Sequence, residues 1–236
     1  MNDDNPTTTS KVYKALSVPV RRQILEHISR EGPVDLKTLI DVTGMKEPTV
    51  RHHLLVLERA GLISMSEEHQ GSRGRPRMLF TMTHDHWSIG FPQRQYQMLA
   101  EHLLQHIIER EGAKGAVKAL RKIGQDVAQS LLDEVTTAKG SDEVEIEDVV
   151  KHILPALDQL GSIVEAIDTE DCDLQIQMRN CIFFELAQAY HGIICQGHAA
   201  IFETIAKALG KDYESVAASC LASGDDRCIT CIKRRK

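Results

Sequence analysis

The first 83 residues alternate between short apolar stripes at helical spacing and polar turns. Ser17-Val18-Pro19 is a start signal for a helix that Gly32-Pro33 ends. A compact helix is predicted from Asp35 to Gly44, and another begins with polar residues near Lys46 and ends at Gly61. Two helices joined by a tight glycine-containing turn, with the second polar at its start, predict a helix-turn-helix. The predicted core positions are Val20, Ile24, Leu25, Ile28, Val50, Leu54, Leu55 and Leu57.

Two β-competent segments, residues 62–68 and 77–83, follow this motif and flank the basic stretch HQGSRGRPRML. Such a stretch suits either a detached hook that enters a minor groove or the tip of a hairpin. The strands on both sides favour the hairpin. We therefore predict a winged helix-turn-helix whose wing is the basic stretch.

The second helix of a helix-turn-helix sets its N-terminal residues against base edges in the major groove. Arg51 is the strongest candidate for guanine, because a guanidinium can bond two acceptors at once; His53 alternatively faces the core. The wing arginines suit a phosphate backbone or a narrow minor groove, and the alternative for them is a solvated basic loop. The predicted DNA-binding residues are Glu47, Thr49, Arg51, His52, His53, Arg73, Arg75 and Arg77.

In the remainder of the chain, the pattern of apolar and polar residues predicts more helices and a small sheet. Residues 91–112 place Tyr96, Leu99, Leu103 and Ile107 on one helical stripe, which indicates a dimerisation helix or, equally well, packing on the protomer's own core. A helix over about 113–135 and an exposed loop over 136–148 come next. The later predictions are a helix at 147–160, strands at 162–169 and 174–180, a helical region at 181–209, and strands at 215–222 and 227–233.

Length and charge support an α+β protein with a separate DNA-binding part. The 236 residues suffice for two modest cores. Residues 1–83 carry a net charge of +2 and the rest a net charge of −8, as expected for a DNA contact followed by an acidic domain. We assign residues 1–88 to the winged helix-turn-helix, 89–140 to a connecting dimerisation region and 141–236 to an α+β sensor domain. Without a membrane-spanning run or a secretion signal, a cytoplasmic protein is expected.

All six cysteines lie in the last 65 residues, which in a reducing compartment favours metal or redox chemistry over structural disulfides. Their irregular spacing differs from that of a zinc ribbon. A straight helix from Cys181 to Cys195 would separate their Cα atoms by about 21 Å, so joint ligands need a bend, which His191-Gly192 offers. Cys228 and Cys231 would face opposite sides of a strand. The predicted metal ligands are Cys181, Cys195, Cys220 and Cys228, against the alternative of buried free cysteines.

These residues carry a family resemblance. The helix-turn-helix with GSRGRPRMLFTMT resembles the ArsR/DeoR-like winged-helix repressors, and the tail from Asn180-Cys181 to Cys220 and Cys228 resembles the SufR group of iron–sulphur-dependent regulators. The resemblance implies a homodimer with a 4Fe-4S cluster in each protomer. Two recognition helices held in such a dimer should bind an inverted-repeat operator on double-stranded DNA. It also implies repression of iron–sulphur assembly genes that ends when the cluster is lost. The chain departs from the group at Ile182, where a proline is usual, and in its extra Cys172 and Cys231.

Other interpretations stay open at this point. The fourth ligand is Cys228, His191 or a group outside the chain. The hairpin SCLASGDDRC also resembles small-molecule-binding domains of the vinyl-reductase type, so zinc, haem or an organic ligand is the alternative signal. A redox enzyme is not expected, because the sequence shows neither a glycine-rich nucleotide fingerprint nor a convincing acid–base pair.

Overall fold

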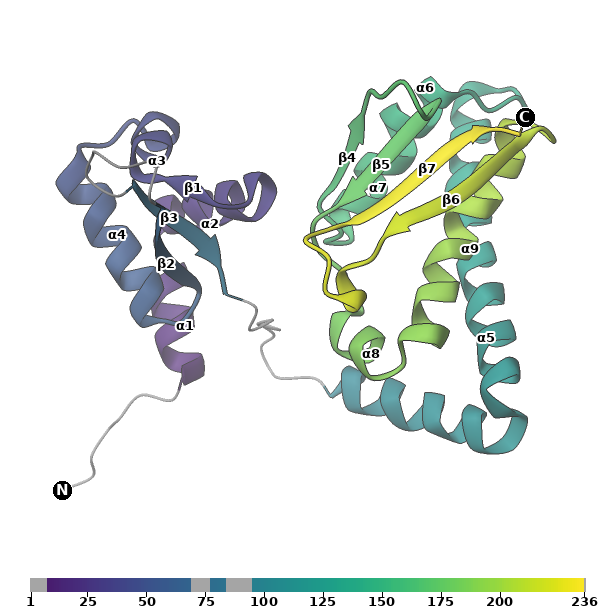
Figure 1. The fold of residues 1–236 in the computed structure, drawn as a ribbon, viewed down its shortest axis with the longest axis horizontal. Coiled ribbons are helices and arrows are strands. Elements are labelled where there is room, and N and C mark those ends of the chain that lie inside the picture. The colour runs from purple at the N-terminus through teal and green to yellow at the C-terminus, as the bar shows by residue number, and fades with distance from the viewer. Residues whose placement is uncertain (1–7, 69–76, 84–94, 236) are drawn as a thin grey trace. The chain divides into compact units, whose positions relative to one another are not determined.

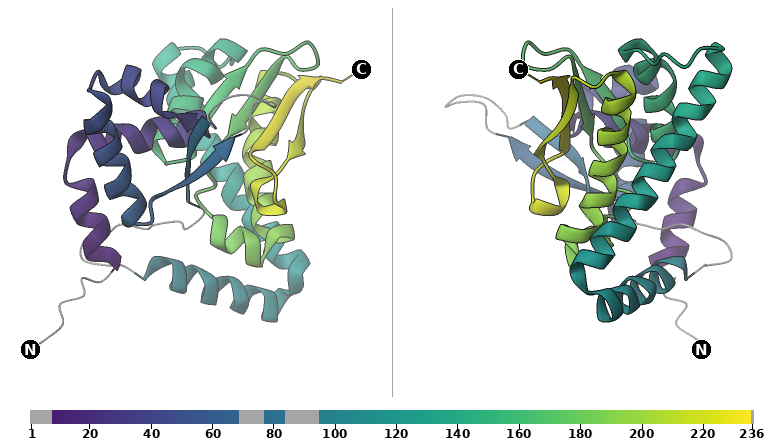
Figure 2. Two further views of the ribbon diagram at one scale, coloured as in Figure 1. Left: turned by 60° about the vertical axis from the view of Figure 1, so that its left-hand side comes forward. Right: turned by 90° about the vertical axis from the view of Figure 1, so that its right-hand side faces the viewer.

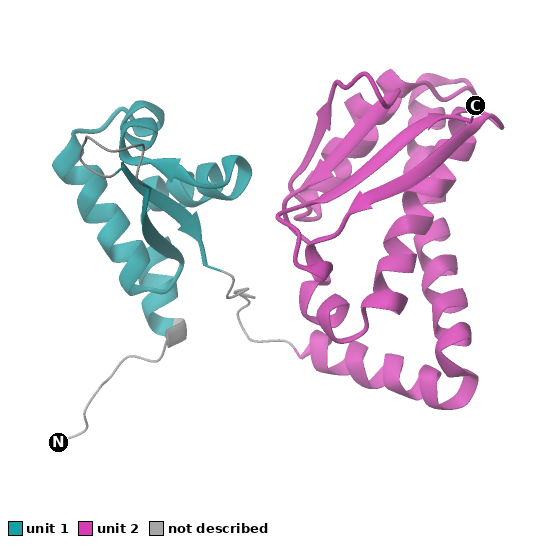
Figure 3. Cartoon of the chain, in the orientation of Figure 1, with its two compact units in different colours: residues 1–92 teal, residues 93–236 magenta. Residues whose placement is uncertain are grey.

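The computed structural model describes residues 8–68, 77–83 and 95–235. The chain forms two compact units, residues 1–92 and 93–236 (Figure 3). The first unit contains α1 (Thr8–Leu16), α2 (Pro19–Glu31), β1 (Val34–Asp35), α3 (Leu36–Thr43), α4 (Glu47–Arg59), β2 (Ile63–Glu68) and β3 (Arg77–Met82). Its three strands pair antiparallel in the order β1-β3-β2, which is the sheet that a winged helix-turn-helix requires.

Local signals set the helices of the first unit as the sequence predicts. Pro19 occupies the first turn of α2. Asp35 caps α3 by accepting a hydrogen bond from the Thr38 backbone N–H at 2.8 Å, and Gly44 ends that helix in the left-handed region, at φ 64°. Pro48 lies in the first turn of α4, where its missing N–H costs no helical hydrogen bond.

The core of the first unit lies among α2, α3, α4 and the sheet. The predicted burial of Val50, Leu54 and Leu57 is confirmed, whereas that of Leu55 is wrong. Leu55 is 39% exposed because it lies about 100° around α4 from Leu54, outside the buried stripe. The buried residues of this core include Ile24, Ile28, Leu39, Val50, Leu54, Leu57 and Phe80.

The second unit is an antiparallel sheet covered by helices on one face. Its sheet has the order β4-β5-β7-β6. Helix α9 packs on this sheet and α5 runs beside α9 (Figures 1 and 2). The elements are α5 (Tyr96–Lys139), α6 (Ile146–Asp148), the π-helical turn η1 (Val149–Ile153), α7 (Leu154–Gln159), β4 (Val164–Ile167), β5 (Leu174–Met178), α8 (Phe184–Ala189), α9 (His191–Leu209), β6 (Tyr213–Ser219), the 3-10 turn η2 (Leu221–Ser223) and β7 (Cys228–Arg234).

Two apolar clusters hold the second unit together. The main core joins α5, α7, α9 and the sheet, with Ile153, Ile176, Phe202, Ile205 and Ile232 almost fully buried. A smaller cluster joins α5, α8 and α9 around Leu104, Ala116, Ala187, Ile193 and Ile194. Cys181 and Cys195 pack against the smaller cluster and Cys228 packs against the main core. The cysteines therefore lie on the margins of both clusters.

Helix α5 changes direction at Gly112, whose φ of 71° and ψ of 175° are not helical. Glycine accepts this conformation because it has no Cβ. The sequence predicted separate helices on either side of this point, and a connecting region over 89–140. The structure differs from the predicted connecting region. Ala128, Leu132 and Val135 of α5 are buried in the main core, so this helix belongs to the second unit.

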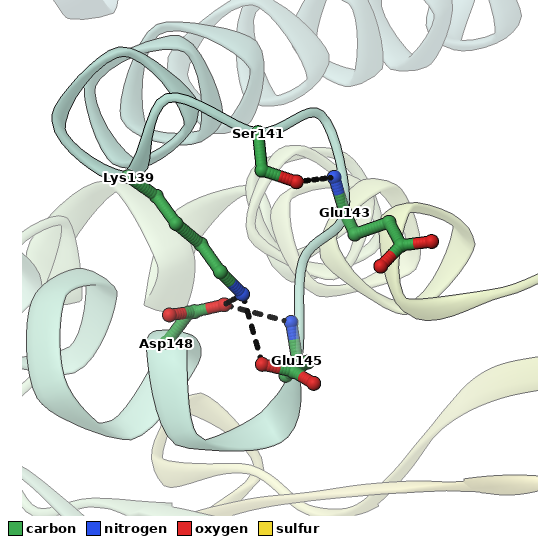
Figure 4. A network of polar contacts seen from close by, with 5 residues as sticks. All are labelled: Lys139, Ser141, Glu143, Glu145 and Asp148. Carbon is green, nitrogen blue, oxygen red and sulfur yellow. Dashed lines mark hydrogen bonds and ion pairs between the residues drawn. The ribbon is translucent and has the colours of Figure 1, made fainter.

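The predicted loop over 136–148 is more ordered than expected. Helix α5 continues to Lys139, whose ammonium donates to Glu145 Oε2 and Asp148 Oδ2, each at 2.8 Å (Figure 4). Asp148 also accepts the Glu145 backbone N–H at 3.0 Å. The hydrogen bonds that Lys139 donates to Asp148 and Glu145 raise the pKa of Lys139. The network fixes the end of α5 to the start of α6. In the described part of the chain, no helix has both the length and the apolarity needed to span a bilayer.

Candidate nucleic-acid interface and metal centre

The start of α4 presents a polar surface. Glu47, Thr49, Arg51 and His52 are exposed there, one turn after Gly44 separates α3 from α4. Arg51 Nε donates to Glu47 Oε1 at 2.8 Å, and both side chains are 55% exposed. An ion pair this exposed contributes little, about 0–1 kcal/mol, so it leaves Arg51 available to a stronger acceptor.

Among the predicted DNA-binding residues of α4, His53 is less exposed than the other four. It is half-buried, its Nδ1 is enclosed without a hydrogen-bond partner among the described residues, and burial lowers its pKa. A neutral imidazole on the inner side of α4 matches the interpretation in which His53 faces the core.

The wing residues fall into two groups. Arg73 and Arg75 lie outside the described residues. Arg77 begins β3, where its Nε donates to Asp35 Oδ2 at 2.8 Å and its guanidinium lies 4.0 Å from Glu68. The same carboxylate caps α3, so Asp35 joins the base of the wing to the helix-turn-helix. The Thr38 amide and then Arg77 hold the pKa of Asp35 at about 2. Sequence reasoning missed this pair, since no local pattern links residues 42 positions apart.

The four predicted ligand cysteines come from four segments. Cys181 precedes α8, Cys195 lies in α9, Cys220 follows β6 and Cys228 begins β7. The Sγ atoms of Cys195 and Cys220 are 3.7 Å apart. Cys228 Sγ accepts a hydrogen bond from the Leu221 backbone N–H at 3.2 Å, across the turn that follows Cys220.

The thiols of Cys181, Cys195 and Cys228 each have a raised pKa to which a neighbouring thiol contributes. Burial raises the pKa of Cys195 to about 12, and the thiols of Cys220, Cys181 and Cys228 add to that shift. Burial and the thiols of Cys220 and Cys181 likewise raise the pKa of Cys228 to about 12. Burial raises the pKa of Cys181, with a contribution from Cys220. Without a cation beside them, the thiols of Cys195 and Cys228 are protonated at neutral pH.

A break in the helical region brings Cys181 and Cys195 together. The sequence predicted a bend at His191-Gly192, and the structure places it one residue earlier, at Tyr190, with φ −131° and ψ 44°. The Tyr190 hydroxyl accepts a hydrogen bond from Gln105 Nε2 at 2.9 Å. This bond fixes the break against the first half of α5.

His191 is the further donor beside the thiols. Ligand atoms of His191, Cys195 and Cys220 lie within 4.8 Å of one another. His191 Nε2 is 3.0 Å from Ser223 Oγ, in the turn between Cys220 and Cys228. The sequence marked His191 as an alternative ligand, but it missed Ser223, for which it offered no signal.

Cys172 and Cys231 stand apart from this group. They form a disulfide, although the sequence favours metal or redox chemistry over structural disulfides for its cysteines. Along β7, Thr230 and Ile232 are buried and Cys228 packs on the main core, so Cys231 points to the other face of the sheet. This agrees with the predicted opposite orientations of Cys228 and Cys231.

Comparisons with known proteins bear on the first unit. A family model described as a helix-turn-helix domain matches residues 16–65. An uncharacterized HTH-type transcriptional regulator of Methanocaldococcus jannaschii is 30% identical over 59 residues, which are 25% of this chain and 66% of that protein. The chain thus spans slightly less than two thirds of that relative. The first unit therefore contains a helix-turn-helix domain, as the sequence predicts.

Two solved structures give only weak matches to the chain. A trafficking protein particle complex subunit 3 from Naegleria fowleri, covalently bound to palmitic acid, gives a TM-score of 0.42 at 15% identity, covering 60% of this chain and 93% of that one. Bacillus subtilis PadR in complex with operator DNA gives 0.25 at 11% identity, covering 80% and 95%. Since both TM-scores are below 0.5, neither establishes a shared fold.

Proposed function

We propose that the chain is a transcriptional regulator that binds double-stranded DNA through α4 and the wing. The match to a helix-turn-helix domain and the exposed polar start of α4 support DNA binding. In this arrangement Arg51 reads guanine, while Thr49 and His52 contact bases or phosphates. Arg73 and Arg75 contact the DNA backbone or minor groove, whereas Arg77 mainly anchors the wing through Asp35.

The signal is an iron–sulphur cluster, and the convergence of four thiols from four segments is the observation that carries this proposal. Iron–sulphur clusters take cysteine thiolates at irregular spacings. The donor set fits a 4Fe-4S cluster, because the Sγ atoms of Cys195 and Cys220 are 3.7 Å apart and Cys228 Sγ accepts a hydrogen bond from Leu221, the residue after Cys220. The thiol of Cys220 also helps to raise the pKa of Cys181, Cys195 and Cys228. Bound iron supplies the positive charge that converts such thiols to thiolates.

A structural change caused by loss of the cluster can be transmitted to α5 through α9. Cys195 lies in α9, and Gly197, two residues later, contacts α5 so closely that a Cβ on Gly124 would lie 2.0 Å from the Gly197 oxygen. Arg121 of α5 donates to Gln196 at 3.2 Å, beside the same cysteine. Any shift of α9 on ligand loss therefore moves α5, the helix that follows the DNA-binding unit in the chain.

The protein acts as a homodimer in this proposal. The apolar stripe of α5 divides: Leu104 is buried and Ile107 packs against the smaller cluster, whereas Tyr96, Leu99 and Leu103 are 70%, 54% and 55% exposed. The exposed part is available to the same helix of a second copy. Two copies related by a two-fold axis would read an inverted repeat.

The resemblance to the SufR group names the regulated genes as those for iron–sulphur assembly, with repression by the cluster-bound form. Anaerobic purification of the full chain tests the cofactor. Brown protein with iron and sulphide in equal amounts supports the cluster, and its loss in Cys195→Ser but not in Cys231→Ser assigns the ligands. Colourless protein without sulphide after anaerobic reconstitution contradicts the proposal.

A further inference from the structure

The spacing between Cys195 and Cys220 suits a single metal ion. For a tetrahedral zinc ion with Zn–S bonds of about 2.3 Å, two bound thiolates lie about 3.8 Å apart. The observed Sγ–Sγ distance is 3.7 Å. Thiolates on different irons of a 4Fe-4S cluster lie further apart, because the separation of the two irons adds to the distance. These two sulphur atoms therefore already have the spacing of ligands to one ion.

His191 supplies a third donor with the position and support that such a site needs. Its ring nitrogen and the sulphur atoms of Cys195 and Cys220 lie within 4.8 Å of one another. Ser223 Oγ, 3.0 Å from His191 Nε2, gives the ring an oriented hydrogen-bond partner, as groups around metal-binding imidazoles commonly do. Cys181 and Cys228 lie outside this compact group.

We propose that the chain also binds one zinc ion through His191, Cys195 and Cys220, as a form that excludes the cluster. Imidazole and thiolate are common zinc ligands, and a tetrahedral ion needs no wider spacing than the structure has. Binding exchanges the protons of two thiols for the ion, so each Zn²⁺ bound releases two protons from Cys195 and Cys220. The zinc form and the cluster form share Cys195 and Cys220. The zinc form adds His191, whereas the cluster form adds Cys181 and Cys228.

Two variants separate the forms. Metal-free full-length protein is titrated anaerobically with Zn²⁺ against a chromophoric chelator, and with Co²⁺ as an absorbance probe for tetrahedral thiolate ligation. We expect one ion per chain and binding weakened at least about tenfold in His191→Ala. Cys228→Ser should keep the ion, and His152→Ala, which removes an exposed histidine of η1, serves as the control.

Cluster reconstitution of the same variants keeps this inference apart from the proposed function. His191→Ala should take up wild-type amounts of iron and sulphide, whereas Cys228→Ser should not. Unchanged zinc affinity and Co²⁺ spectrum in His191→Ala would overturn the single-ion site, as would a loss of zinc binding in Cys228→Ser. Failure of wild-type protein to assemble a cluster would instead contradict the proposed function and leave the zinc result standing.

Discussion

Arg77 Nε donates to Asp35 Oδ2 at 2.8 Å and so joins the first residue of β3 to the N-cap of α3. The two residues are 42 positions apart in the sequence. One carboxylate thus caps the start of α3 and accepts a hydrogen bond from the first residue of β3. The contact therefore holds the first residue of β3 against the start of α3.

The pair predicts an acid-sensitive contribution to stability. The pKa of Asp35 is about 2 in the folded chain, below its ordinary value of 3.8, so its contribution is complete above about pH 4 and is lost as the pH falls through 2. Asp35→Asn retains a capping side chain but not the charge. We expect it to lower the free energy of unfolding by about 1–2 kcal/mol at pH 7 and to match the wild type near pH 2.

Urea unfolding followed by circular dichroism between pH 2 and pH 7 measures this difference. Asp41→Asn is the control, because Asp41 is an exposed aspartate of the same helix. Equal stability of Asp35→Asn and wild type at pH 7 would show that the contact contributes nothing.

Arg51 should dominate base reading by α4. Arg51→Ala is expected to cost about 1–3 kcal/mol of binding free energy, or about 5- to 150-fold in affinity, for a duplex selected from a random pool by the wild-type protein. Arg59→Ala removes an exposed arginine at the other end of the same helix and is expected to change affinity little. Equal losses in both variants would indicate a general charge effect in place of base reading.

The exposed stripe of α5 predicts a disruptable dimer. Leu99→Glu places a charge where the proposed second copy packs, so sedimentation equilibrium should show monomers at concentrations at which the wild type is dimeric. Leu160→Glu, at an equally exposed leucine following α7, is the matched control. A dimer that persists in the Leu99 variant would place the interface elsewhere.

The crossing of α5 and α9 leaves no room for a side chain. A Cβ on Gly124 would lie 2.0 Å from the Gly197 backbone oxygen, so Gly124→Ala must push the helices apart and should destabilise the protein by about 1–3 kcal/mol. A Cβ on Gly192 of α9 would have no other atom within 4 Å, so Gly192→Ala should leave the stability unchanged or raise it slightly. Thermal unfolding of both variants compares the two sites, and an unchanged Gly124→Ala protein would contradict the close packing.

The periodic parts of the fold could be predicted from the sequence. Val50, Leu54 and Leu57 repeat at helical spacing, and Asp35 and Gly44 are local start and stop signals. Strands β2 to β7 lie within their predicted ranges or overlap them by most of their length, whereas the two-residue strand β1 was not predicted. The predicted burial of Leu55 is wrong because Leu55 is one residue after Leu54 in the helix, so its side chain points away from the core.

Contacts between distant segments could not be predicted in the same way. Sequence spacing shows that Cys181 and Cys195 need a bend between them, but the exact break at Tyr190 depends on its bond to Gln105, 85 positions away. The disulfide between Cys172 and Cys231 likewise depends on the pairing of β5 with β7, which brings Gln175 opposite Cys231. Such contacts follow from tertiary packing and leave no periodic signal.

In the proposed regulator, the thiol site controls DNA binding. The most direct test measures the affinity of the full chain for the selected duplex in its anaerobically reconstituted and metal-free forms, with Cys195→Ser measured under both conditions. A coupling of about 1–3 kcal/mol predicts that the wild-type cluster form binds about 5- to 150-fold more tightly, while the variant binds weakly under both conditions. Equal wild-type affinities in the two forms would contradict the claim.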